Sequence, residues 1–149
     1  MKVSDILRVK GNTLFTVTSQ DPLAQAVKVM ADNDIGSLVV MDQGKLTGML
    51  TFREVIQQVV KNGGAIGASL IRDAMDSQPR TSGMDTELDE VRRMMLEHHT
   101  RYLPVMQDHM LMGVISFYDV AKAVVDSQDF ENKMLKAYIR DWPEEKDKA

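Results

Sequence analysis

The sequence has no cysteine, so disulfide bonds, thiolate metal sites and cysteine nucleophiles are excluded. It also lacks any stretch near the roughly 20 uncharged apolar residues that cross a bilayer, and its start, MKVSDILRVKG, has no apolar run like that of a secretory signal. No basic patch is concentrated anywhere, because 18 Lys and Arg and 22 Asp and Glu are spread through the 149 residues, with a net charge of −4. We therefore expect a cytoplasmic protein that binds neither a membrane nor nucleic acid.

Residues that could carry catalysis or bind a metal are also sparse. The histidines, His98, His99 and His109, do not have the i, i+4 spacing of a metal-binding pair, and no carboxylate cluster completes a site. No Gly-x-Ser-x-Gly nucleophile motif occurs. The sequence thus predicts no catalytic residue, no metal and no cofactor, and we expect a protein that is not an enzyme.

The sequence contains an internal repeat. Shifting it by 65 positions aligns residues 23–55 with residues 88–120 without a gap. The identical pairs are Leu23/Leu88, Met30/Met95, Leu38/Leu103, Val40/Val105, Met41/Met106, Leu46/Leu111, Gly48/Gly113, Phe52/Phe117 and Val55/Val120. Upstream, residues 3–7 resemble residues 71–75 at a slightly larger offset. The predicted units are repeat 1 (1–62), a linker (63–68), repeat 2 (69–127), and a C-terminal helix and tail (128–149).

Within one repeat, the pattern predicts the order β-α-β-β-α. Asp21 is expected to cap a helix that has Pro22 at its first position and apolar residues at helical spacing. Strand-like runs at 38–41 and 46–50 flank a hairpin turn at 42–45. Residues 15–18 supply the first strand, and 52–60 the second helix.

The predicted fold class is α+β, with two tandem repeats. A single copy of about 60 residues has a marginal core, so we expect the two copies to pack about a pseudo-twofold axis. Packing of this kind creates a cleft between the repeats, and such clefts are favoured places for small ligands.

The third strand of each repeat ends in a similar phrase, residues 48–54 (GMLTFRE) and 113–119 (GVISFYD). Thr51 with Glu54, and Ser116 with Asp119, have the spacing of a capping box at the start of a helix. A hydroxyl and a carboxylate at a helix N-terminus could equally bind a ligand, since the exposed amides there favour phosphate. The pattern alone favours the structural interpretation, although a capping box prefers Glu to Asp.

These phrases, the tandem duplication and the YLPV run at 102–105 resemble the cystathionine-β-synthase (CBS) domain, and the likeness extends to about residue 126. The chain is similar to a stand-alone CBS pair, or Bateman module. The resemblance implies that Asp119 holds the ribose hydroxyls of an adenosine nucleotide and that Ser116 lies near its phosphate. The full set implied for this Asp119 site is Ser116, Asp119, Ile35, Gly36, Ser37, Phe15 and Arg101.

The resemblance implies a second site in which Glu54 replaces the aspartate of the family. Its extra methylene extends the carboxylate by over ~1 Å into the space of a ribose, so we expect this site to fit less well. The set implied for this Glu54 site is Thr51, Glu54, Arg80, Thr100 and Tyr102.

The function implied is that of a regulatory sensor for AMP, ADP or ATP, which signals to an unknown protein target. S-adenosylmethionine or NAD are alternative ligands. Two other hypotheses are a ligand-free assembly module and an enzyme related to the regulatory segment of inosine-monophosphate dehydrogenase. We also expect a homodimer formed through the second helices.

A C-terminal helix is expected to pack on its own module or to lie at a subunit interface. Its apolar residues are Phe130, Met134, Leu135, Tyr138, Ile139 and Trp142.

Overall fold

The computed structural model describes residues 1–11 and 14–140, apart from the side chains of Phe130, Tyr138 and Arg140. The first repeat consists of β1 (Thr16–Val17), α2 (Leu23–Asn33), β2 (Ser37–Asp42), β3 (Lys45–Thr51) and α3 (Phe52–Lys61). The second consists of β4 (Ser82–Gly83), α5 (Leu88–His98), β5 (Tyr102–Gln107), β6 (Met110–Ser116) and α6 (Phe117–Arg140). Two further helices, α1 (Val3–Lys10) and α4 (Ile71–Ala74), precede the repeats. The predicted β-α-β-β-α order is confirmed twice.

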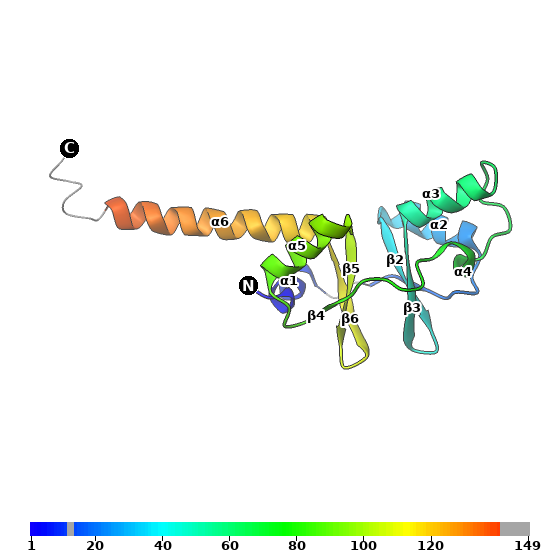
Figure 1. The fold of residues 1–149 in the computed structure, drawn as a ribbon, viewed down its shortest axis with the longest axis horizontal. Coiled ribbons are helices and arrows are strands. Elements are labelled where there is room, and N and C mark those ends of the chain that lie inside the picture. Colours follow the sequence, from blue (N-terminus) through cyan, green and yellow to red (C-terminus); the bar gives the residue numbers. More distant parts are fainter. Residues whose placement is uncertain (12–13, 141–149) are drawn as a thin grey trace.

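Each repeat forms its own three-stranded sheet, with the orders β1-β2-β3 and β4-β5-β6. The short first strand is parallel to the second, and the second and third form an antiparallel hairpin. The two hairpins lie beside each other at the centre of the molecule, while α6 extends from one end (Figure 1). The predicted α+β class is therefore confirmed.

The hairpin turn of the first repeat follows the sequence prediction. Asp42 pairs with Lys45, and the two residues between them, Gln43 and Gly44, both have positive φ angles, of 52° and 76°. Two successive positive φ angles are the mark of a type I′ turn, whose twist matches that of the strands it joins.

The prediction that Asp21 caps the first helix is wrong. Helix α2 begins at Leu23 and has Pro22 in its N-cap position, with no side-chain cap. The carboxylate of Asp21 instead accepts a hydrogen bond from the backbone N–H of Thr18, at 2.9 Å. Asp21 thus stabilises the turn before the helix, because its side chain reaches back along the chain.

The two helices that precede the repeats are exchanged between the two cores. Val3, Ile6 and Leu7 of α1 are buried in the core of the second repeat, whereas Ile71 of α4 is buried in the core of the first. Backbone hydrogen bonds fix both ends of this exchange. The donors and acceptors are Val3 N to Thr86 O, Leu88 N to Met1 O, Leu23 N to Ser69 O, and Ile71 N to Asp21 O, each 2.9 Å long.

The glycine shared by both closing phrases gives room for the exchanged segments. A Cβ at Gly48 would lie 2.7 Å from the carbonyl oxygen of Asp76, and a Cβ at Gly113 would lie 3.0 Å from a methyl group of Leu7. Two hydrogen bonds with Met49, of 3.0 and 2.9 Å, hold the backbone of Asp76 in place. The glycine is therefore required because a neighbouring segment crosses the third strand at close range.

The C-terminal helix is present, but it is the continuation of the second helix of repeat 2. Helix α6 runs unbroken for 24 residues, and its far half projects beyond the folded body (Figure 1). Met134, Leu135 and Ile139 are exposed there, so the expectation that this face packs on its own module is wrong for these residues. Among the described residues, the core of the second repeat extends along α6 as far as Val124, so these three side chains lie beyond it. Trp142 lies outside the described residues.

We predict that Gly48→Ala destabilises the protein more than Gly113→Ala. Overpacking against the fixed carbonyl of Asp76 should lower the free energy of unfolding by roughly 2 kcal/mol, whereas the Leu7 side chain can move aside. Urea denaturation at a fixed protein concentration measures both variants. Equal transition midpoints for the two would contradict this account of the crossing segments.

Candidate functional site

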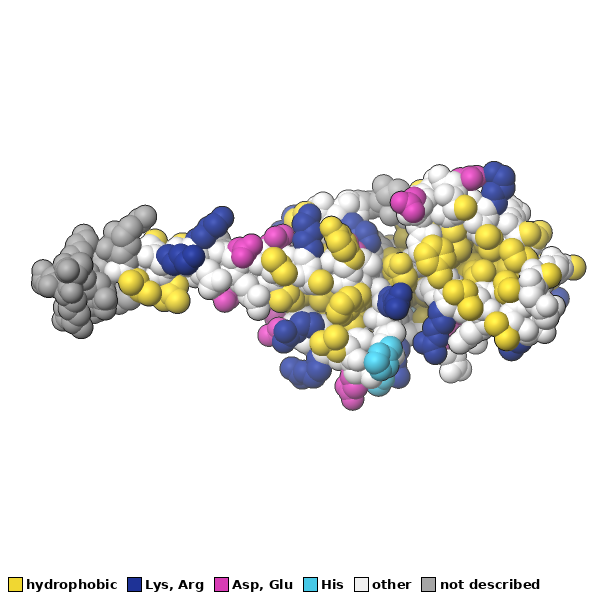
Figure 2. Space-filling model, turned by 90° about the horizontal axis from the view of Figure 1, so that it is seen from above, with side chains coloured by type: hydrophobic (Ala, Val, Ile, Leu, Met, Phe, Trp, Pro, Cys, Tyr) yellow, Lys and Arg dark blue, Asp and Glu magenta, His cyan; other side chains and the backbone are white. Residues whose placement is uncertain are grey.

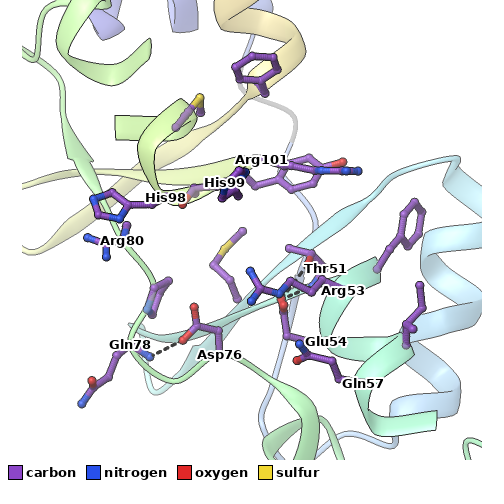
Figure 3. A pocket seen from close by; sticks show the side chains of 18 of the residues that line it. Thr51, Arg53, Glu54, Gln57, Asp76, Gln78, Arg80, His98, His99 and Arg101 are labelled. Carbon is purple, nitrogen blue, oxygen red and sulfur yellow. Dashed lines mark hydrogen bonds between the residues drawn. The ribbon is translucent and has the colours of Figure 1, made fainter. Parts of the chain in front are cut away.

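A cleft of about 1250 Å³ lies between the two repeats. One wall comes from the end of β3 and the start of α3, and the other from α5 and the start of β5 (Figure 3). All the residues predicted for the Glu54 site line this cleft: Thr51, Glu54, Arg80, Thr100 and Tyr102. The structure therefore brings this predicted set together, although its members come from both repeats.

The Glu54 carboxylate is held at the first turn of α3. Its Oε1 accepts hydrogen bonds from the backbone N–H of Thr51, at 3.0 Å, and from the hydroxyl of Thr51, at 2.8 Å. Burial raises the pKa of Glu54 above its ordinary value, the bonds from Thr51 oppose the rise, and the nearby charge of Asp76 adds to it. Among the described residues, the hydrogen bonds to this carboxylate reach Oε1 alone, so the group combines a fixed position with a second oxygen that can still accept.

Three arginines and two histidines give the cleft much of its polar character. Arg53 adjoins Glu54, while Arg80, His98, His99 and Arg101 belong to the opposite side (Figure 3). Among the described residues, the ion pairs within 4.0 Å do not include any of the three arginines. A guanidinium group carries several donors in a fixed fork, which suits it to an anionic group.

The sequence analysis did not predict several of the residues that line the cleft. Arg53 lies within the closing phrase, next to Glu54, and could have been assigned from that position. Asp76 and Gln78 could not, because they lie after α4, whose exchange into the first repeat leaves no sequence signal. The sequence also assigned Arg101 to the Asp119 site, whereas the structure places it in the cleft of the Glu54 site.

The Asp119 site begins with a complete capping box. The backbone N–H of Ser116 donates to Oδ2 of Asp119, at 2.8 Å, and the backbone N–H of Asp119 donates to Oγ of Ser116, at 3.1 Å. The expectation that an aspartate suits such a box poorly is wrong here, and Asp5 and Asp73 accept the equivalent backbone hydrogen bond at the start of α1 and α4.

The Asp119 carboxylate also forms an ion pair with Lys10. Its Nζ lies 2.7 Å from Oδ2 of Asp119 and donates to the carbonyl oxygen of Val114 at 2.8 Å. Burial alone would raise the pKa of Asp119, but the hydrogen bonds and charge of Lys10 and the N–H of Ser116 hold it below its ordinary value. The sequence did not identify Lys10, which is 109 positions away along the chain.

The residues implied to line the base in the Asp119 site belong to the first repeat. Phe15 and Ile35 pack against its core, and Ser37 begins β2. Gly36 lies against Tyr102, since a Cβ at this glycine would be 2.1 Å from the tyrosine hydroxyl. Gly36 therefore accommodates a side chain of the other predicted site, and the two sites adjoin at this contact.

Among the residues that the structure describes, no helix is long and apolar enough to cross a membrane. The His, Asp and Glu side chains of these residues do not form a group of three that could hold a metal ion.

The family comparison agrees with the repeat and with this geometry. The model of the CBS domain matches residues 3–61 and 71–126, which is most of the chain. The chain belongs to the CBS domain family. The predicted tandem CBS pair is thereby confirmed.

Individual CBS proteins are similar along most of the chain. The CBS domain-containing protein CBSX3, mitochondrial, of Arabidopsis thaliana is 28% identical over 147 residues, covering 93% of this chain and 71% of the relative. A protein with CBS domains from Burkholderia ambifaria MC40-6 has a TM-score of 0.80 and 33% identity, covering 86% of this chain and 96% of that one. The CBS domain pair of protein MJ0100, solved in complex with 5′-methylthioadenosine and S-adenosyl-L-methionine, has a TM-score of 0.74 and 22% identity, covering 85% and 98%. At that identity it shows the shared fold alone.

The carboxylates of Glu54 and Asp119 are predicted to affect the stability of the protein in opposite directions at neutral pH. A raised pKa means that ionisation of Glu54 costs stability as pH rises above the ordinary value of 4.5. Glu54→Gln should therefore raise the urea midpoint at pH 7, with a gain that shrinks toward pH 4. The lowered pKa of Asp119 contributes stability that is lost as pH falls through its value in the folded protein, so Asp119→Asn should lower the midpoint at pH 7.

Urea titrations from pH 4 to pH 8 measure both effects. The two variants serve as controls for each other, because each replaces a carboxylate in a capping box by the matching amide. A midpoint shift of the same sign in both variants at pH 7 would contradict the assigned pKa directions.

Proposed function

We propose that this CBS pair is a regulatory, non-catalytic sensor that binds an adenosine nucleotide between its repeats and signals to a partner protein. The observation that carries the proposal is the cleft, which a fixed carboxylate lines together with three arginines that form no ion pair among the described residues. A carboxylate can accept two hydrogen bonds from the cis-diol of a ribose. Guanidinium groups and the amides at a helix N-terminus suit phosphate.

The charges of the cleft favour a phosphate-bearing ligand. Arg53, Arg80 and Arg101 attract phosphate, and they repel the sulfonium of S-adenosylmethionine. AMP, ADP and ATP are therefore the ligands we propose, with NAD as the next candidate. The complex of protein MJ0100 with two adenosine compounds supports only the view that this fold has room for them.

Signalling follows from the position of the ligand between the repeats. A nucleotide that contacts both walls binds one relative arrangement more tightly and so increases its population. The helices α3 and α6 start at the closing phrases, so their outer faces would carry the change to the partner. We place this regulation in the cytoplasm, as the sequence predicts.

Binding is predicted to depend on the two closing carboxylates. Calorimetric titration with AMP, ADP, ATP, S-adenosylmethionine and NAD should give saturable binding of an adenine nucleotide. The double variant Glu54→Ala/Asp119→Ala should weaken this binding at least about tenfold, because charge-assisted hydrogen bonds to the ribose are lost.

Asp129→Ala is the matched control, since Asp129 is an exposed carboxylate on α6 that does not line the cleft. It should bind as the wild type does. Absence of binding for all five compounds would refute the sensor and leave the assembly module as the better interpretation. Turnover of a nucleotide would instead revive the enzyme hypothesis.

An exposed apolar face on α3 supports a homodimer as well. Phe52, Ile56 and Val60 are all exposed, Val60 by 73%. Apolar side chains gather over the lobe that carries α3, and others lie on the projecting part of α6 (Figure 2). Phe52 and Ile56 also line the cleft, whereas Val60 does not. We propose that a second copy covers the α3 face around Val60, because contiguous apolar surface of this kind is typical of protein interfaces.

Val60→Glu is predicted to convert a dimer into a monomer. Its charge would be buried at the interface, but Val60 does not line the cleft, so nucleotide binding should persist. Light scattering after size-exclusion chromatography measures the mass. Val9→Glu, at a position 86% exposed on α1, is the control and should leave the dimer intact. A monomeric wild type, or a dimeric Val60→Glu variant, would contradict the proposed interface.

A further inference from the structure

We propose that Lys10 determines which of the two sites a nucleotide fills, because its ammonium group holds the Asp119 carboxylate that the ribose would need. This inference rests on the proposed function. In the resting protein the Glu54 cleft would bind first, and the Asp119 site would bind only when Lys10 is released. The closing phrases alone rank the sites in the opposite order.

The first observation is that one oxygen of Asp119 already has two donors. Its Oδ2 accepts from Nζ of Lys10 at 2.7 Å and from the N–H of Ser116 at 2.8 Å. A cis-diol that binds through both carboxylate oxygens must compete for this atom. The side chain of Asp119 is only 17% exposed, so its charge pair with Lys10 is less screened than a pair on the open surface.

The second observation is that a docked helix positions the lysine. Lys10 is the last residue of α1, three positions after Leu7, which is buried in the core of the second repeat. The Nζ also donates to the carbonyl oxygen of Val114, so two acceptors define its place. The ammonium group is therefore held at Asp119 by the exchanged helix, and a ligand that displaces it acts directly on the end of α1.

The third observation is that the other site lacks this lysine. In the sequence, the offset of 68 positions that relates Val3 to Ile71 and Leu7 to Met75 aligns Gln78 with Lys10, although α4 ends at Ala74 while α1 continues to Lys10. Gln78 lines the cleft, and its backbone N–H donates to Asp76 at 3.0 Å (Figure 3). The hydrogen bonds to Glu54 come from Thr51 alone among the described residues, so no cation has to leave when a ribose arrives.

Binding of ATP is expected to depend on Glu54 in the wild type and on both Glu54 and Asp119 once Lys10 is replaced. Lys10→Gln introduces the residue found at the matching position, and α1 keeps its buried contacts through Val3, Ile6 and Leu7. Calorimetric titration with ATP should show one binding event per wild-type chain, which is lost in Glu54→Ala and retained in Asp119→Ala. The Lys10→Gln variant should add a second event, or tighten a weak one by about tenfold or more, the factor expected for one charge-assisted hydrogen bond.

Two further variants make the outcome specific. In Lys10→Gln/Asp119→Ala the added event should disappear, which ties it to the Asp119 carboxylate. Gln78→Lys should weaken the event at the Glu54 cleft and leave the Asp119 site unchanged. Circular dichroism and urea midpoints confirm that each variant is folded.

The results separate this inference from the proposed function. Nucleotide binding that is the same in wild type and Lys10→Gln, or weaker in Lys10→Gln, would overturn the role of Lys10 while leaving the sensor in place. A wild-type event lost in Asp119→Ala and kept in Glu54→Ala would also overturn it. Absence of binding of AMP, ADP, ATP, S-adenosylmethionine and NAD in every variant would refute both.

Discussion

The exchange of α1 and α4 between the two cores is the contact on which the rest of the structure depends. Each repeat is too small to have more than a marginal core, and each buries a helix that belongs to the other part of the duplicated sequence. Neither half can therefore complete its interior without the other. The close crossing of these segments over the third strands also explains why both repeats have a glycine there, at Gly48 and Gly113.

The elements within each repeat were predictable because their signals are local. Alternating apolar residues, helical spacing and the turn at Gln43 and Gly44 each act over a few positions, and the duplication supplied an internal check. The exchange was not predictable, because the apolar residues of α1 and α4 suit either core equally well. The same limit applies to Lys10, whose contact with Asp119 depends on tertiary packing and leaves no trace in a local pattern.

The residues of the candidate sites were predictable from the sequence, but the hydrogen bonds that already hold their carboxylates were not. All five residues of the Glu54 site meet in one cleft, because the closing phrase and the second strand of the other repeat approach each other. The sequence could not reveal that the cap and the ligand site use the same atoms. Thr51 and Ser116 fix the two carboxylates at their helix ends, and that fixed position is also what a ribose requires of its acceptor.

The unbroken course of α6 gives the molecule a lever arm. Asp119 lies in its first turn, and the 21 residues that follow within the helix extend about 32 Å at 1.5 Å per residue. A tilt of about 10° at the base would thus carry the far end through about 5 Å. A small adjustment around one carboxylate would therefore move the far end of α6 by about the pitch of one helical turn.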